Sequence, residues 1–159
     1  MQDGDMRILA PDEVPQALRA DGRALFAASH VIAPDETSAL VPHANNIVIL
    51  GWIDRIASLH GAAAGAAREA LALEGRMWFV ARHEVDYLGE GFAGDELVVA
   101  TWVESLGRTS LMRATRIVRR GDGKELVRAL SRWALVDLAS RKPVAMPEAV
   151  RAALAGRGQ

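Results

Sequence analysis

The sequence predicts an α+β fold in which an antiparallel sheet of about five strands curves around one long helix. Residues 46–61 support the helix, because they are apolar over most of a helical circumference, which is typical of a buried helix. Four segments after Gly75 support the sheet, since each is long and rich in Val, Leu, Thr and Trp. Short glycine-containing connections link the later segments and are typical of hairpins, which pair antiparallel.

The chain before the long helix predicts a short helix, one strand and a polar loop. The short helix falls within residues 12–20, where Pro15 limits its length. The strand is expected over residues 25–32 and the polar loop over residues 35–38.

Beyond the long helix, residues 62–73 predict a second, looser helical piece, and the strands follow it. The four strands are expected over residues 77–87, 96–106, 110–120 and 125–137. Pro147 favours the start of a short helix over residues 148–155. Because one sheet on one helix leaves edges and a face uncovered, we expect a symmetric dimer.

The segment that opens the long helix, Pro42-His43-Ala44-Asn45-Asn46, is the candidate functional site. Asn is a preferred N-cap because its side-chain oxygen accepts hydrogen bonds from the free backbone N–H groups of the first turn. Those N–H groups and the positive end of the helix dipole also favour a developing negative charge. The two asparagines can therefore act as a cap, as substrate contacts, or as both.

Composition and charge exclude several classes of protein. The chain has 159 residues, a net charge of −1 and a pI of about 6.4, which do not indicate nucleic-acid binding. It has no cysteine, which excludes disulfides and thiolate chemistry. No apolar run approaches the roughly 20 residues of a membrane helix, so we expect a cytoplasmic protein without a membrane partner. His30, His60 and His83 have no metal-ligand spacing, and we expect no metal and structural or surface roles for them.

The order of elements and several motifs resemble the hot-dog fold thioesterases, in particular the branch with 4-hydroxybenzoyl-CoA thioesterase and the acyl-ACP thioesterases. The segment from His43 to Ile53 is similar to the H-x-N-N-(x)4-G-W-I stretch of the acyl-ACP type. Residues 107–111 are similar to a sheet motif of the branch. The resemblance implies a hot-dog domain over residues 23–156, after an N-terminal extension over residues 1–22.

The resemblance implies hydrolysis of an acyl thioester of coenzyme A or acyl carrier protein, with coenzyme A only as part of the substrate. Members similar to 4-hydroxybenzoyl-CoA thioesterase use a carboxylate in the loop before the central helix, as nucleophile or as base for water. That carboxylate lies seven positions before the histidine, where this chain has Glu36, and Asp35 is the alternative. We expect His43 and Asn45 as further catalytic residues. In the acyl-ACP branch the acid lies four positions before the histidine, where this chain has Ala39.

Five residues are expected to bind the substrate. They are Asn46, Trp52, Arg108, Thr109 and Ser110. The arginines from Arg108 to Arg120 can contact the phosphates of coenzyme A, or they can form a solvated sheet face. The tryptophans, Trp52 included, can instead pack the core or a dimer interface.

Two further functions were weighed against thioester hydrolysis. A hot-dog protein that binds an acyl thioester without turning it over is the main alternative. A hot-dog dehydratase or hydratase is disfavoured, because the chain lacks the Asp/His loop and the histidine motif of those enzymes. We expect the pocket to lie at the interface of a homodimer, or within a tetramer.

Overall fold

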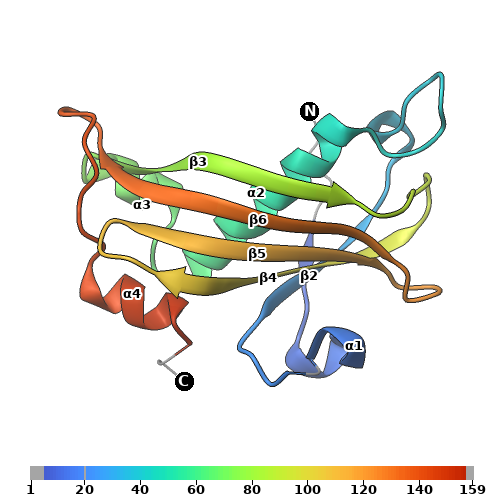
Figure 1. The fold of residues 1–159 in the computed structure, drawn as a ribbon, viewed down its shortest axis with the longest axis horizontal. Helices are drawn as coiled ribbons and strands as arrows, with labels where there is room; N and C mark the ends of the chain where they lie inside the picture. Colours follow the sequence, from blue (N-terminus) through green and yellow to red (C-terminus); the bar gives the residue numbers. More distant parts are fainter. Residues whose placement is uncertain (1–5, 20, 157–159) are drawn as a thin grey trace.

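The computed structural model describes residues 6–19 and 21–156 of the chain. Six strands form one sheet in the order β1-β2-β4-β5-β6-β3, and all neighbours are antiparallel (Figure 1). The strands are β1 (Arg7–Ile8), β2 (Phe26–Val31), β3 (Arg76–Tyr87), β4 (Glu96–Leu106), β5 (Ser110–Arg119) and β6 (Glu125–Asp137). The predicted α+β class and antiparallel sheet are confirmed, with β1 as a strand that the sequence patterns did not predict.

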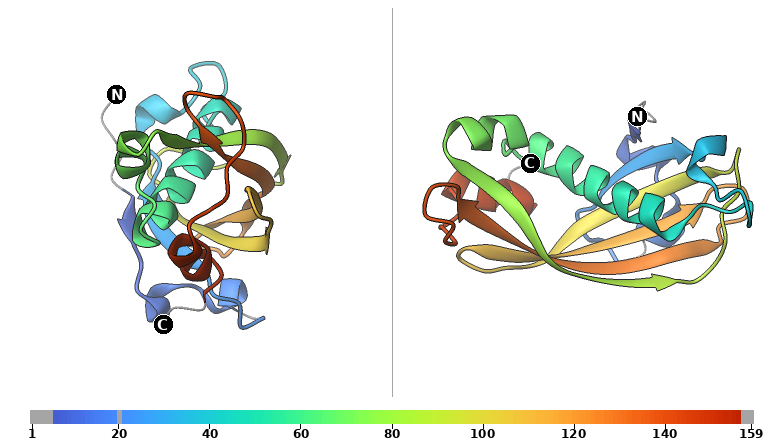
Figure 2. Two further views of the ribbon diagram at one scale, coloured as in Figure 1. Left: turned by 90° about the vertical axis from the view of Figure 1, so that its left-hand side faces the viewer. Right: turned by 90° about the horizontal axis from the view of Figure 1, so that it is seen from above.

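One long helix, α2 (Asn46–Ala63), crosses the inner face of the curved sheet (Figure 2). Ile53 and Ile56 are fully buried and Ile49 is nearly so. On another side of the first turn, Ile47 is 76% exposed. The buried helix predicted from the sequence therefore forms, while its first turn keeps an apolar side chain in solvent.

The remaining elements are short. They are α1 (Gln16–Arg19), α3 (Arg68–Leu73), α4 (Glu148–Leu154) and the two 3-10 helices η1 (Pro11–Glu13) and η2 (Pro34–Glu36). The helix expected over residues 12–20 is split at Pro15 into η1 and α1, and residue 20 lies outside the described residues. None of the helices described in the structure is long and apolar enough to cross a membrane.

The N-terminal residues pack on the outer face of the sheet. Leu9, Val14 and Leu18 form a buried cluster there with Val98 and Ala100 of β4. The predicted boundary between an extension and the domain stays a prediction.

Between α2 and the sheet, two apolar clusters are separated by a polar layer. We use the name polar layer for Thr101, Arg113, Thr115 and Ser131, which are buried on the inner faces of β4, β5 and β6. Along β5, for example, Ile117 belongs to the cluster under the first half of α2. Leu111, on the other side of the polar layer, belongs to the cluster near α3 and α4. The layer thus divides the core near the middle of the sheet.

Candidate active site

The carboxylate of Glu36 is held against β2 and α2 by three donors. Its Oε2 accepts a hydrogen bond from the backbone N–H of Ala33 at 2.8 Å and lies 2.8 Å from Nε2 of His30. Its Oε1 accepts a hydrogen bond from the indole N–H of Trp52 at 2.9 Å. The 3-10 turn η2 brings the side chain of Glu36 back to Ala33, the residue just before the turn, so the chain leaving β2 aims this side chain at α2.

His30 also belongs to this site. The sequence patterns predicted only a structural or surface role for it. It lies on the face of β2 that also carries Phe26 and Ala28, both packed into the cluster under α2. Its side chain is almost fully buried, and its ring lies 5.1 Å from that of Trp52. The sequence signal for this role is a histidine on the apolar face of a predicted strand. A buried ring at that position needs a polar partner.

The electrostatics of the site keep Glu36 ionised. Burial alone raises the pKa of its carboxyl, but the hydrogen bonds from Ala33, Trp52 and His30 together outweigh burial and lower the pKa below its ordinary value. The side chain is 20% exposed. Within the described residues, Oε1 accepts one hydrogen bond, which leaves it a free lone pair for a water molecule.

Asp35 and Glu36 occupy the same 3-10 turn but have different surroundings. Asp35 is exposed, whereas Glu36 is partly buried and bound to two other elements. Of the two carboxylates that the sequence offered, Glu36 is therefore the one that the fold positions.

The start of α2 is tied to the backbone of Glu36. Asn45 is the N-cap, with an extended backbone, and its Oδ1 accepts a hydrogen bond from the N–H of Val48 at 3.0 Å. Its own N–H donates to the backbone oxygen of Glu36 at 3.3 Å, which ties η2 to the helix start. Asn46, the first helical residue, is exposed. The N–H groups of Asn46 and Ile47 belong to the first turn, where the helix itself supplies no acceptor.

His43 lies on the loop before the helix and faces a different acid. Its Nδ1 lies 2.9 Å from Oε1 of Glu90, and its backbone pairs with that of Phe92. No hydrogen bond in the described residues joins His43 to Glu36. Glu90 had no sequence signal, since 47 positions separate it from His43 and the pairing of their two loops is tertiary.

Arg108, Thr109 and Ser110 lie elsewhere. They form the β4–β5 hairpin, where the backbone oxygen of Arg108 accepts a hydrogen bond from the N–H of Met146, just before α4. Figure 1 shows this hairpin and α4 at one end of the sheet, and the loop between η2 and α2 at the other. Within one chain the structure brings Glu36, Asn45, Asn46 and Trp52 together and leaves the hairpin residues apart from them.

The arginines after Gly107 do not share one face. Arg116 binds Glu125, Arg119 binds Asp122, and Arg120 binds Glu96 in partly exposed ion pairs. The expectation of a solvated face is wrong for Arg113, because its side chain faces inward and belongs to the polar layer. It differs from its neighbours because the alternation of β5 turns every second side chain toward α2.

Comparison with protein-family models gives a match over most of the chain. A scan against protein-family models matches residues 36–154 to the thioesterase-like superfamily. A search of curated proteins finds no match.

Solved structures share the fold at low sequence identity. A 1,4-dihydroxy-2-naphthoyl-CoA thioesterase from Synechocystis has a TM-score of 0.76 at 14% identity, over 82% of this chain and 96% of that one. An acyl-ACP thioesterase from Bacteroides thetaiotaomicron has 0.69 at 22% identity, over 78% and 50%. A hypothetical protein from Staphylococcus aureus, solved in complex with CoA, has 0.76 at 17% identity, over 85% and 84%.

Proposed function

The chain belongs to the thioesterase-like superfamily, which confirms the resemblance seen in its motifs, and we propose that it hydrolyses an acyl thioester of coenzyme A or acyl carrier protein. The observation that carries this proposal is the ionised Glu36, held by His30, Ala33 and Trp52 beside the start of α2. The named thioesterases among the structural neighbours support the substrate class, and the neighbour bound to CoA supports a coenzyme A thioester.

In the proposed reaction, the thioester carbonyl lies at the first turn of α2. The free N–H groups of Asn46 and Ile47, with the helix dipole, stabilise negative charge on the carbonyl oxygen. Glu36 either takes a proton from the attacking water or attacks the carbonyl itself, forming an anhydride that water then hydrolyses. In both cases the acyl–sulfur bond breaks, the thiolate leaves and takes up a proton, and the oxygen of water ends on the released acid.

His43 is the second proposed catalytic residue. Its contact with Glu90 fixes the ring at the loop that leads into Asn45. From there the imidazole binds the carbonyl or assists the water; the alternative role of this side chain is to fill space. Asn45 holds the first turn in shape through its cap, so that the N–H groups face the carbonyl.

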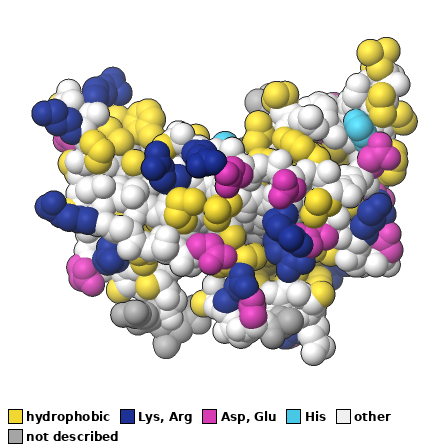
Figure 3. Space-filling view, in the orientation of Figure 1, with side chains coloured by type: hydrophobic (Ala, Val, Ile, Leu, Met, Phe, Trp, Pro, Cys, Tyr) yellow, Lys and Arg dark blue, Asp and Glu magenta, His cyan; other side chains and the backbone are white. Residues whose placement is uncertain are grey.

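We propose that the working unit is a homodimer, or a tetramer built from dimers. Within the described residues β3 pairs only with β6, so its other edge has free backbone groups, and Phe79, Val80 and Tyr87 on it are exposed. The loops around the start of α2 are also apolar, and Figure 3 shows hydrophobic side chains gathered at this end. The exposed large hydrophobic residues of these loops and of the first turn of α2 are Leu40, Val41, Ile47, Leu88 and Phe92.

A second copy against these surfaces would cover the open side of the site. It would also give Arg108, Thr109 and Ser110 a route to a substrate that they do not have in one chain. Their role as substrate-binding residues, and a cytoplasmic location, stay predictions.

The test is a panel of acyl-CoA and acyl-ACP thioesters, with release of free thiol as the readout. We expect at least one thioester to be hydrolysed with saturation, and mass spectrometry to find the free acid. Binding of the same thioesters is measured in parallel by calorimetry, so that a failure to bind and a failure to react are distinguished.

A second candidate function is binding of an acyl thioester without turnover. One observation favours it: both oxygens of Glu36 already hold η2 to β2 and α2, which is a structural use of the carboxylate. Tight binding across the panel without thiol release would establish this function in place of hydrolysis.

A further inference from the structure

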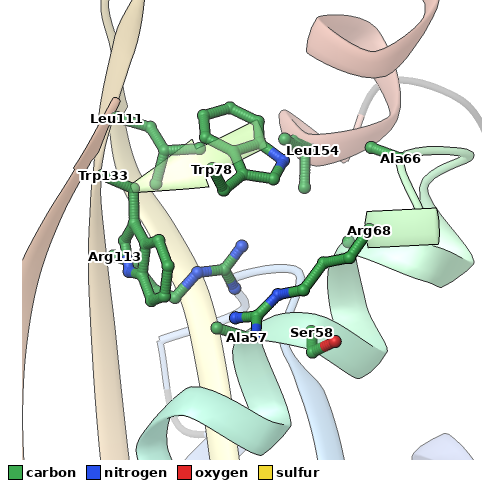
Figure 4. A pocket seen from close by; sticks show the side chains of 10 residues that line it. Ala57, Ser58, Ala66, Arg68, Trp78, Leu111, Arg113, Trp133 and Leu154 are labelled. Atoms are coloured by element: carbon green, nitrogen blue, oxygen red, sulfur yellow. The ribbon is translucent and has the colours of Figure 1, made fainter. Parts of the chain in front are cut away.

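A small cavity lies beyond the polar layer, between the second half of α2, α3 and the inner face of the sheet. It has a volume of about 20 Å3, and its lining includes Arg68, Trp78, Leu111, Arg113, Trp133 and Leu154. Figure 4 shows the guanidinium groups of Arg113 and Arg68 directed into the same space, with the rings of Trp78 and Trp133 beside it. The buried apolar cluster under the first half of α2 separates this cavity from Glu36.

Arg113 is the feature of the cavity that demands an explanation. Its side chain is 4% exposed, and no ion pair with a carboxylate is found for it in the described residues. Nη1 donates to Nδ1 of His60 at 2.8 Å and to Oγ1 of Thr101 at 3.2 Å. Nε is buried without any hydrogen-bond partner. A buried cation that lacks an anionic partner is strongly destabilising, so an anion in the cavity would compensate it.

The other ionisable groups around the cavity leave one positive charge uncompensated. Arg68 is neutralised by Asp54, which accepts two hydrogen bonds from it at 3.0 and 2.8 Å. Burial, and then the charge of Arg113, lowers the pKa of His60 to about 4, so this imidazole is neutral and accepts through Nδ1. Burial lowers the pKa of Arg113 to about 10, which keeps it a cation at neutral pH.

We propose that this cavity binds a small monovalent anion, which the Arg113 guanidinium holds through its free N–H groups. The volume accommodates a group about the size of one water molecule. A halide ion fits that limit, and formate is the smallest carboxylate that would match the fork of a guanidinium. The single uncompensated charge disfavours dianions such as sulfate.

The cavity wall adds a second unpaired donor to that of Arg113. The indole of Trp133 lies within cation–π distance of Arg68, 5.8 Å from its guanidinium carbon to the ring centroid, and its own buried N–H has no partner. Leu111 and Leu154 supply the remaining apolar contacts. A small anion between Arg113 and Trp133 can accept hydrogen bonds from both unpaired donors.

The test measures the melting temperature of the full chain at constant ionic strength, while sodium gluconate is replaced by sodium bromide, formate or acetate. Gluconate is a monovalent carboxylate too large for the cavity. A ligand that binds only the folded state raises the melting temperature as its concentration passes the dissociation constant. We expect this rise with at least one small anion, and a bromide peak beside Arg113 in anomalous diffraction from soaked crystals.

Two arginine variants separate the site from general salt effects. Arg113→Met keeps the length of the side chain but removes its charge and donors, and should weaken anion binding by about 10- to 100-fold. Arg116→Met changes an arginine three positions along β5, paired with Glu125, and should keep the wild-type response. Since Arg113→Met removes a buried charge, its stability in gluconate should be unchanged or higher, and a folded variant remains available for the comparison.

Each outcome is decisive for the site. A response to bromide alone identifies a halide site, and a stronger response to formate or acetate identifies a carboxylate site; both support the proposal. The proposal is overturned if the wild type responds equally to gluconate and the small anions. It is also overturned if Arg113→Met responds like the wild type, or if bromide-soaked crystals hold only water in the cavity.

Discussion

The two halves of α2 face ionised groups of opposite sign, and the fold treats them differently. Near the start of the helix, the carboxylate of Glu36 receives hydrogen bonds from neighbouring donors and keeps partial contact with solvent. Near its end, the guanidinium of Arg113 is almost fully buried, and part of its donor set has no acceptor. The first charge is satisfied within the chain, whereas the second is not.

The difference shows what each region is ready to do. A carboxylate that is hydrogen-bonded and partly exposed reduces the stability of the fold little, and it can contact a substrate that binds from solvent. A buried cation without an anionic partner destabilises the fold, and an anion that binds it would reduce that cost. The predictions below test the two regions separately, beginning with the largest expected effect.

Replacing the charge at the start of the helix should have the largest effect on turnover. Glu36→Gln keeps the size of the side chain and an oxygen acceptor for Trp52, but removes the negative charge. We expect turnover of the best thioester to fall by about 10²- to 10⁴-fold, with little change in binding. Thiol release and calorimetry on the same preparations measure the two quantities.

Asp35→Asn is the matched control, because it makes the same chemical change one position earlier on an exposed side chain. It should keep near wild-type turnover. If Asp35→Asn is inactive and Glu36→Gln is active, the acid is Asp35. If both stay active, no carboxylate in η2 takes part in the reaction.

At the end of the helix, acid should destabilise the protein through His60. Its pKa is about 4 in the folded chain and about 6.5 when unfolded, so the unfolded state binds more protons between these values. Stability should therefore fall by about 3 kcal/mol as the pH drops from 6.5 to 4. Urea unfolding at a series of pH values measures this loss.

His60→Gln supplies the control for that pH range. Glutamine can accept the hydrogen bond from Arg113 through its side-chain oxygen and does not titrate. The variant should lose clearly less stability between pH 6.5 and 4. Glu36 acts in another range: its pKa is lowered, so its contribution is complete above pH 4.5 and is lost only below it. Parallel curves for wild type and His60→Gln would show that His60 does not cause the loss of stability.

His43→Ala should reduce turnover less than Glu36→Gln, by roughly 10- to 100-fold, because the N–H groups of α2 that stabilise the oxyanion are retained. Glu90→Gln keeps a hydrogen-bond acceptor for the ring and should have a smaller effect. Wild-type turnover in His43→Ala would remove His43 from the mechanism.

Substitutions at the N-terminus of α2 should have the smallest effects, which we expect on stability. Asn45→Ala removes the acceptor for the N–H of Val48 and should cost about 1 kcal/mol of stability. Asn46→Ala, at an exposed position of the first turn, should cost less than about 0.5 kcal/mol. A loss of turnover in Asn46→Ala without loss of stability would identify that side chain as a substrate contact.

Local patterns predicted most of the fold. The richness of residues 96–106 and 125–137 in Val, Leu, Thr and Trp placed two strands at their observed bounds. The two-residue β1 is too short for such a pattern. The helix over residues 12–20 failed at Pro15, whose missing N–H and ring interrupt the ladder of hydrogen bonds.

The candidate site was only partly predictable. The cap by Asn45 follows from a local preference, and Glu36 entered through the family resemblance. The partners of these residues did not follow, since His30 and Trp52 meet Glu36 only after the sheet and α2 have packed. The same holds for Arg113, whose inward direction depends on the register of β5 and not on the basic composition of its segment.

The unequal edges of the sheet limit how copies of this chain can polymerise. β3 offers twelve residues on one side, whereas the opposite side ends in the two residues of β1. Two copies that join their β3 strands around a two-fold axis consume the long side of each. What remains at both ends is too short to template another strand, so growth terminates and a fibre cannot propagate.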